Sequence, residues 1–243
     1  MRIDILTLFP EMCEAVLGES IIGRAQRKGA IEIKYTNFRD YTDSKHGTVD
    51  DYPYGGGAGM LLRAQPIYDA FMAICAETET RPHLIYMSPQ GKTLTQARAH
   101  ELSKLNNIAI LCGHYEGVDE RLIEEIVDEE ISIGDFVLTG GELPAMVLVD
   151  CIARHVDGVL SSEECYKEDS HFSGLIEYPQ YTRPASWRGR EVPGVLLSGH
   201  HANIEKWRRE QSLVRTLSKR PDILKTESLS EKDKEFLKKF SNI

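Results

Sequence analysis

Short apolar runs alternate with stretches of helical spacing over residues 1–156. The apolar runs have the length of buried strands and lie at residues 2–9, 31–36, 83–87, 108–112 and 130–134. The helical stretches lie at residues 11–17, 20–28, 66–79, 95–104, 119–127 and 142–156. Strands that alternate with helices predict an α/β fold with a mostly parallel sheet and helices on both of its faces.

One of these predicted helices is apolar nearly all round, from residue 143 to residue 153. A helix without a polar face is buried on both sides. One side can cover the sheet, and the other needs a further partner. The pattern therefore predicts a homodimer that forms through this helix.

The pattern changes beyond residue 158. Residues 159–173 are mixed and acidic, which is typical of a linker, and an amphipathic helix over residues 202–219 is followed by a shorter helix at 230–240. The sequence thus predicts an α/β domain at 1–158, a flexible linker at 159–173 and a small helical domain at 174–243.

The charge is distributed unevenly along the chain, whose net charge is −9. Residues 174–243 contain 14 Lys and Arg and 9 Asp and Glu residues, a net charge of +5, which leaves −14 for residues 1–173. The C-terminal domain can therefore bind a polyanion through the helix residues Lys206, Arg208, Arg209 and Arg215, or present a solvated helical face.

Composition excludes several classes of protein. The chain has 243 residues, 41% of them hydrophobic, and no apolar run of about 18 residues that would predict a membrane span. Its five cysteines include no Cys-x-x-Cys pair, which argues against a disulfide framework and against a zinc cluster. The N-terminus lacks the pattern of a signal peptide, so we expect a cytoplasmic protein.

Three predicted strands end in glycine-containing loops, at residues 88–91, 113–117 and 134–141. In open α/β sheets, ligands bind outside the carboxyl ends of the strands. The loops therefore predict a small-molecule pocket built largely from backbone groups. The sequence does not match the phosphate-binding loop motif, because Tyr86 stands where that motif requires its first glycine. Residues 55–59 likewise do not match the dinucleotide-binding motif.

Several stretches along the chain, considered together and in their order, resemble the bacterial tRNA (guanine-N1)-methyltransferases of the SPOUT superfamily. The resemblance covers essentially the whole chain, although residues 52 and 58 depart from the family pattern. The matching stretches are residues 4–10, 50–60, 88–91, 111–119, 133–144, 168–172, 178–184 and 196–201.

The resemblance implies a deep trefoil knot at the end of the α/β domain and a homodimer in which each site uses both chains. It implies methyl transfer from S-adenosylmethionine to N1 of the guanosine just 3′ of the anticodon, position 37 of tRNA. Alternatives from other classes are a SPOUT enzyme that methylates ribose 2′-O in RNA, and a non-catalytic RNA-binding protein.

The resemblance also assigns residues. Asp169 would be the general base and Arg154 the donor that stabilises charge on guanine O6. Gly59 and Met60 would accept the target base, and an Mg²⁺ ion held by Glu116 and Asp169 is consistent with the family. The cofactor would be bound by Tyr86, Ser88, Pro89, Gln90, Gly91, Gly113, Tyr115, Glu116, Gly117, Ile133, Gly134, Asp135, Phe136, Val137, Leu138, Gly140, Gly141 and Pro144.

Overall fold

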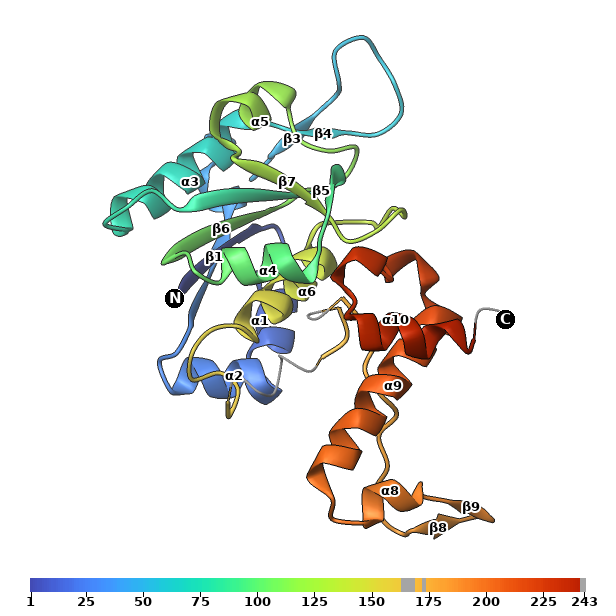
Figure 1. Ribbon diagram of the computed structural model, residues 1–243. Helices are drawn as coiled ribbons and strands as arrows, with labels where there is room; N and C mark the ends of the chain where they lie inside the picture. Colours follow the sequence, from blue (N-terminus) through green and yellow to red (C-terminus); the bar gives the residue numbers. More distant parts are fainter. Residues whose placement is uncertain (163–168, 172–173, 241–243) are drawn as a thin grey trace. The chain divides into compact units, whose positions relative to one another are not determined.

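The computed structural model describes residues 1–162, 169–171 and 174–240 of the chain (Figure 1). These residues form two compact units, Met1–Glu163 and Glu164–Ile243. The division between the units falls inside the segment 159–173 that the sequence assigns to a linker.

Unit 1 is built on a five-stranded sheet in which every neighbouring pair of strands is parallel. The strands are β1 (Arg2–Thr7), β2 (Glu32–Asn37), β5 (His83–Thr93), β6 (Asn107–Cys112) and β7 (Glu129–Ser132), in the order β2-β1-β6-β5-β7. The predicted α/β fold with a parallel sheet is confirmed.

Helices cover both faces of this sheet, as the sequence predicts (Figure 1). Alternate residues of the strands point to opposite faces, so that Ile85 and Met87 pack on one side while Leu84 and Tyr86 pack on the other. The first face is covered by α1 (Pro10–Leu17), α2 (Ser20–Arg27), α4 (Gln96–Leu102) and α6 (Glu142–Ala153). The second face is covered by α3 (Ala64–Glu77) and α5 (Glu120–Ile126).

Strand β5 is longer than the sequence predicts. The sequence predicts a turn at residues 88–92, whereas β5 extends to Thr93. Met87 and Lys92 both pair with Ile131 of β7, so that residues 88–91 bulge out of the ladder. Gly91 permits the close approach to β7, because a Cβ there would lie only 2.4 Å from the backbone of Glu130.

The long connection between β2 and α3 contains short regular elements. A 3-10 helix, η1 (Phe38–Tyr41), is followed by the antiparallel pair β3 (Asp50–Asp51) and β4 (Leu61–Leu62). The glycine-rich segment 55–59 lies between these two strands and is exposed.

Unit 2 is small, and its regular elements are mostly helices. Its described residues form a two-stranded ladder, α-helices and 3-10 helices: β8 (Ser186–Trp187), β9 (Arg190–Glu191), α8 (Gly194–Leu197), α9 (His201–Lys219), η2 (Pro221–Ile223), η3 (Thr226–Ser228) and α10 (Glu231–Lys238). Leu175, Leu213 and Leu229 form its core. Ser230 caps α10 through a reciprocal capping box with Asp233, as the sequence predicts for this serine. Throughout the described ranges, no helix has both the length and the apolar character needed to cross a bilayer.

Candidate functional site

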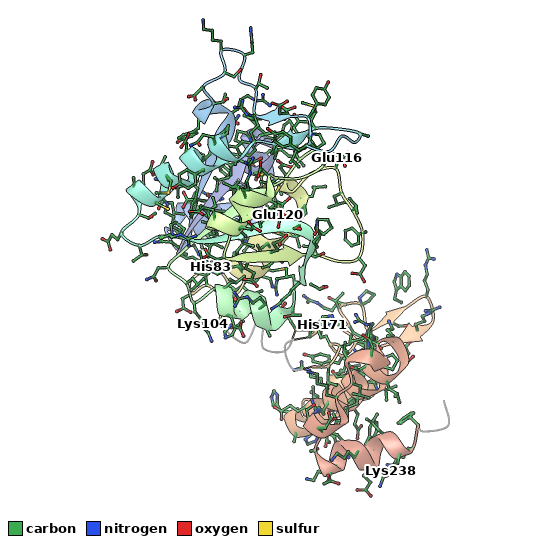
Figure 2. The ribbon with its side chains drawn as sticks, turned by 90° about the horizontal axis from the view of Figure 1, so that it is seen from above. His83, Lys104, Glu116, Glu120, His171 and Lys238 are labelled. Atoms are coloured by element: carbon green, nitrogen blue, oxygen red, sulfur yellow. The ribbon has the colours of Figure 1, made fainter. Side chains whose placement is uncertain are left out.

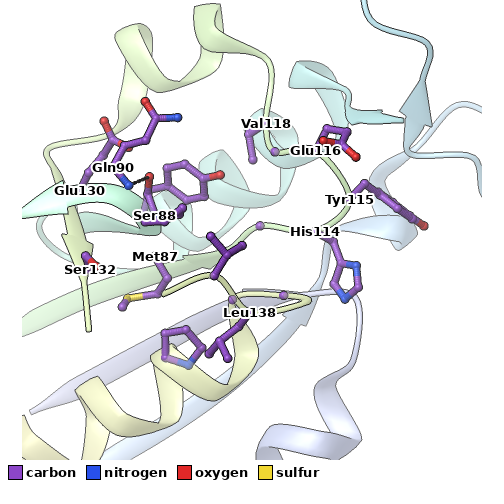
Figure 3. Close-up of a pocket in the computed structure, with 18 of the residues that line it drawn as sticks. Met87, Ser88, Gln90, His114, Tyr115, Glu116, Val118, Glu130, Ser132 and Leu138 are labelled. Carbon is purple, nitrogen blue, oxygen red and sulfur yellow. Dashed lines mark hydrogen bonds between the residues drawn. The ribbon is translucent and has the colours of Figure 1, made fainter. Parts of the chain in front are cut away.

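A pocket of about 520 Å³ opens at the carboxyl edge of the sheet in unit 1 (Figure 3). Its walls come from the loop region of β5, from the loop that follows β6, and from the segment that joins β7 to α6. These are the three glycine-containing loops singled out in the sequence. The sheet order brings them together, since β5 lies between β6 and β7.

Two of the loops are in direct backbone contact. The Gly141 N–H donates to the Gly113 carbonyl at 2.8 Å, and His114 forms an isolated antiparallel bridge with Gly140. A Cβ on Gly141 would lie 2.7 Å from Cys112 Cα and 2.8 Å from the Gly113 nitrogen. Only glycine therefore fits at the point where the segment entering α6 packs on the end of β6.

Tyr86 forms part of the pocket wall from the second face of the sheet. Its side chain is buried, and this burial, together with the nearby carboxylates of Glu130 and Glu120, raises the pKa of Tyr86 to about 12. The phenol is therefore neutral at physiological pH and can donate a hydrogen bond.

The pocket has an acidic lining. Glu116, Glu120 and Glu130 line it, and its lining within the described ranges includes no Lys or Arg. Figure 2 shows Glu116 on the loop after β6 and Glu120 on α5. Such a site favours a ligand with positive charge and disfavours a phosphate.

The glycine-rich segment 55–59 is tied to the same pocket at its C-terminal end. The Glu116 N–H donates to the Met60 carbonyl at 3.0 Å, and the Leu62 N–H donates to the Gly117 carbonyl at 2.9 Å. These bonds hold Gly59 and Met60 next to the loop that carries Glu116, where the sequence places the target base.

Most of the predicted cofactor residues lie around this one pocket. The structure brings fifteen of them to its wall: Tyr86, Ser88, Pro89, Gln90, Gly113, Tyr115, Glu116, Gly117, Ile133, Phe136, Val137, Leu138, Gly140, Gly141 and Pro144. Gly91, Gly134 and Asp135 are not in the lining. Gly91 lies instead against the backbone of β7, and Gly134 and Asp135 lie in the bend between Ser132 and Phe136.

Sequence reasoning missed several residues of the wall, among them His114 and Thr139. The His114 ring packs against Phe9 at 5.1 Å and against Tyr115 at 5.3 Å between centroids. His114 Nε2 also lies 4.0 Å from Glu142 Oε2, while Glu142 Oε1 accepts a hydrogen bond from Thr7 at 2.7 Å. His114 lies between Gly113 and Tyr115, which were both predicted to bind the cofactor, so its position in the sequence could have indicated that it also lines the pocket.

The two predicted catalytic residues belong to different units. Arg154 follows directly after α6 in unit 1 and is half-buried. Asp169 belongs to unit 2, where it is half-buried and precedes Ser170, whose hydroxyl accepts a hydrogen bond from the Glu177 N–H at 3.0 Å. Their catalytic roles stay predictions.

The predicted RNA-binding residues of α9 are partly engaged within unit 2. Arg209 forms an ion pair with Asp233 at 3.0 Å, and Lys206 lies 3.9 Å from Glu210. The Arg208 guanidinium lies over the Tyr178 ring at 4.8 Å, and Arg215 is half-buried. The contacts of Arg208 and Arg209 join α9 to other segments of unit 2, while Lys206 and Glu210 both lie on α9. Arg208 and Arg209 therefore have structural roles beside any role in binding.

The predicted magnesium site finds no support in the described parts of the two units, where no three His, Cys, Asp or Glu side chains gather as metal ligands. The two residues proposed as its ligands, Glu116 and Asp169, lie in different units.

An α/β domain with a backbone-lined, acidic pocket at the carboxyl edge, followed by a basic helical unit, suits the class of proteins that bind a small organic ligand at a sheet edge and a polyanion through basic residues. Comparison with known proteins narrows this class. The sequence profile described as "tRNA (Guanine-1)-methyltransferase TrmD" matches residues 1–226. The chain belongs to this family.

Several similar relatives are named tRNA (guanine-N(1)-)-methyltransferase. One from Ruminiclostridium cellulolyticum is 63% identical and aligns over 92% of this chain and 96% of its own. One from Halalkalibacterium halodurans is 54% identical over 98% of this chain and 96% of its own, and one from Bacillus licheniformis is 53% identical over 100% of both.

Proposed function

We propose that this protein transfers a methyl group from S-adenosylmethionine to N1 of the guanosine at position 37 of tRNA. The main support is that the three loops with the family's motifs line a single acidic pocket of about 520 Å³. The family membership and the names of the relatives support the same reaction.

The charge of the pocket supports the methyl donor as its ligand. Adenosylmethionine has no phosphate and carries a sulfonium cation, which suits a site lined by Glu116, Glu120 and Glu130. The backbone groups of Gly113, Gly140 and Gly141 would bind the adenine and ribose. Phe136 and Leu138 would supply apolar walls. Bound there, the donor supplies an electrophilic methyl group.

The residues of the chain would prepare guanine N1, which is a poor nucleophile while it holds its proton. The Asp169 carboxylate accepts that proton, and the negative charge that develops moves to guanine O6. The Arg154 guanidinium donates to O6 and stabilises this charge. The base must leave its stack to reach the site, and Gly59 and Met60 would accept it. No step is assigned to Mg²⁺.

The active form would be a homodimer in which both chains contribute to each site. The support is an exposed apolar stripe on α6, where Leu143 is 48% and Val147 is 43% exposed. Met12 and Val16 on the neighbouring helix α1 are also exposed.

A trefoil knot around the segment 134–141 belongs to the same proposal, as does a cytoplasmic location, where the tRNA substrate occurs.

The test is to incubate the protein with labelled adenosylmethionine and an unmodified tRNA transcript with guanosine at position 37. We expect label only in N1-methylguanosine after digestion to nucleosides, and none with a transcript that has adenosine at position 37. Label in 2′-O-methylated ribose would instead indicate the alternative SPOUT reaction, and absence of any label would contradict enzymatic function.

A further inference from the structure

A short hairpin projects from unit 2 at the end of α9 opposite α10 (Figure 1). It pairs β8 with β9, so that Trp187 lies opposite Arg190 and Ser186 lies opposite Glu191. Arg188 and Gly189 form the turn with φ angles of 51° and 74°, the backbone signs of a tight two-residue hairpin turn. The Val192 N–H donates to the Ala185 carbonyl at 2.9 Å and closes the base of the hairpin.

The hairpin exposes a large aromatic side chain. Trp187 is 59% exposed, and the Arg188 guanidinium lies over its indole ring at 5.1 Å. All residues from 180 to 191 are exposed. The apolar area of this indole remains unburied in unit 2, and it is available to stack on a partner.

The charge around Trp187 is mainly positive. Arg183, Arg188 and Arg190 are exposed, and Glu191 is the acidic residue of the hairpin. Within the described ranges none of these three arginines forms an ion pair, in contrast to Arg209 on α9, which is bound to Asp233. Their charges are therefore available to an external anion.

We propose that the hairpin 186–191 is an RNA-contacting surface, in which Trp187 stacks on a base of the tRNA and Arg188 and Arg190 bind phosphates. The proposal rests on the proposed function, since it locates where unit 2 contacts the substrate. Aromatic rings between cationic side chains are the combination that binds bases together with their backbone. The net positive charge of the hairpin favours a polyanion, and thus RNA, as the partner.

The first experiment uses the Trp207→Phe variant, in which Trp187 is the one remaining tryptophan of the two in the chain. We expect the tRNA transcript to quench Trp187 fluorescence, with a midpoint equal to the dissociation constant measured by filter binding. Fluorescence that is unchanged at saturating tRNA would overturn the stacking interaction.

The second experiment compares variants with the same change in charge. The double variant Arg188→Ala/Arg190→Ala is compared with a control double variant, Lys232→Ala/Lys238→Ala on α10. All four side chains are exposed. We expect the arginine pair to weaken tRNA binding at least tenfold and to lower the slope of log K against log salt by about 0.7 to 0.9 for each phosphate that the variant no longer binds. The lysine pair should have little effect. Trp187→Ala should weaken binding about tenfold or more, because one base can no longer stack.

The outcomes separate this proposal from the proposed function. If wild-type protein methylates tRNA while the hairpin variants bind tRNA as tightly as the lysine pair, the hairpin proposal is wrong and the function stands. If Trp187 fluorescence responds to protein concentration instead of tRNA, the hairpin is a protein contact and the proposal is also wrong. If wild-type protein neither binds nor methylates tRNA, the proposed function itself fails.

Discussion

Asp169 is the residue to which we assign proton removal from guanine N1. Asp169→Asn keeps the shape of the side chain and removes its ability to accept a proton. We expect the rate of methyl transfer to fall by about 10²- to 10⁴-fold. The affinity for adenosylmethionine, measured by calorimetry, should stay unchanged, because Asp169 is not among the residues assigned to the cofactor. Asp222→Asn, an exposed carboxylate of the same unit, is the control, and equal loss of activity and cofactor binding in Asp169→Asn would contradict the assignment.

Gly141 is the residue at which two pocket loops touch. The Cβ introduced by Gly141→Ala would press on the backbone of Cys112 and Gly113 and move the loops apart. We expect a loss of about 1–3 kcal/mol in the free energy of unfolding and at least tenfold weaker cofactor binding. Gly194→Ala, where a Cβ would meet nothing within 4 Å, should be close to neutral in both assays. Normal cofactor affinity in Gly141→Ala would contradict the view that the contact between these two loops shapes the binding site.

Tyr86 gives a prediction for the pH dependence of stability. Because burial raises its pKa to about 12 in the folded state, the folded protein holds this proton more tightly than the unfolded chain, where the pKa is about 10. The contribution to stability is therefore complete below pH 10 and is lost as the pH rises toward 12. Between pH 9 and pH 11 the loss amounts to about 1 kcal/mol. Urea unfolding of Tyr86→Phe should show a correspondingly smaller decrease, and an identical decrease in both proteins would be inconsistent with a buried phenol.

At the scale of elements, α6 connects the pocket to the proposed dimer interface. Its buried residues cover the sheet, and its exposed stripe contains Leu143 and Val147. Val147→Lys should place a charge in the interface and convert the dimer to a monomer in analytical ultracentrifugation, with loss of activity. Met72→Lys on α3 is a matched control, because Met72 is 44% exposed and Val147 is 43% exposed. A wild-type protein that is monomeric, or a Val147→Lys variant that remains a dimer, would contradict this interface.

The strands and helices of unit 1 could be predicted from the sequence because their apolar periods are strong. Ile108 to Cys112 form a continuous apolar run, and such a run is buried on both faces of a parallel sheet. The continuation of β5 through Ser88-Pro89-Gln90-Gly91 could not be predicted, because these residues have the local chemistry of a turn. The structure places them in a bulge between Met87 and Lys92, which both pair with Ile131 of β7, a contact between residues far apart in the chain. The hairpin 186–191 was also missed, since two-residue strands have no detectable period.

The candidate pocket could be predicted to a large extent from the positions of glycines after strands, as in Gly113 and Gly141. The sequence did not show which of these residues face the pocket and which face a neighbouring strand. His114 enters the wall because its ring packs on Phe9, a residue more than 100 positions earlier in the chain. Gly91 was assigned to the ligand although it packs on Glu130. Positions that face a ligand and positions that face a neighbouring strand have the same local pattern.

At the scale of the whole molecule, the proposed function gives different tasks to two parts of the chain that have net charges of opposite sign. Residues 174–243 have a net charge of +5 and residues 1–173 a net charge of −14. We expect tRNA affinity to fall by an order of magnitude or more between about 50 and 200 mM salt, because phosphate contacts release counterions. Adenosylmethionine affinity should change less than about twofold, since its contacts are local and mostly to backbone groups. If the affinities for tRNA and for adenosylmethionine depended equally on salt, the assignment of tRNA binding to the basic part and of cofactor binding to the α/β part would be wrong.

The central claim is that the three loops at the carboxyl edge of the sheet form the binding site of the methyl donor. The most direct test is a crystal structure of the full chain with adenosylmethionine bound. We predict that the donor occupies the pocket between Tyr86, Gly113 and Gly141, with its sulfonium group toward the acidic wall. A donor bound elsewhere, with these loops empty, would contradict the account.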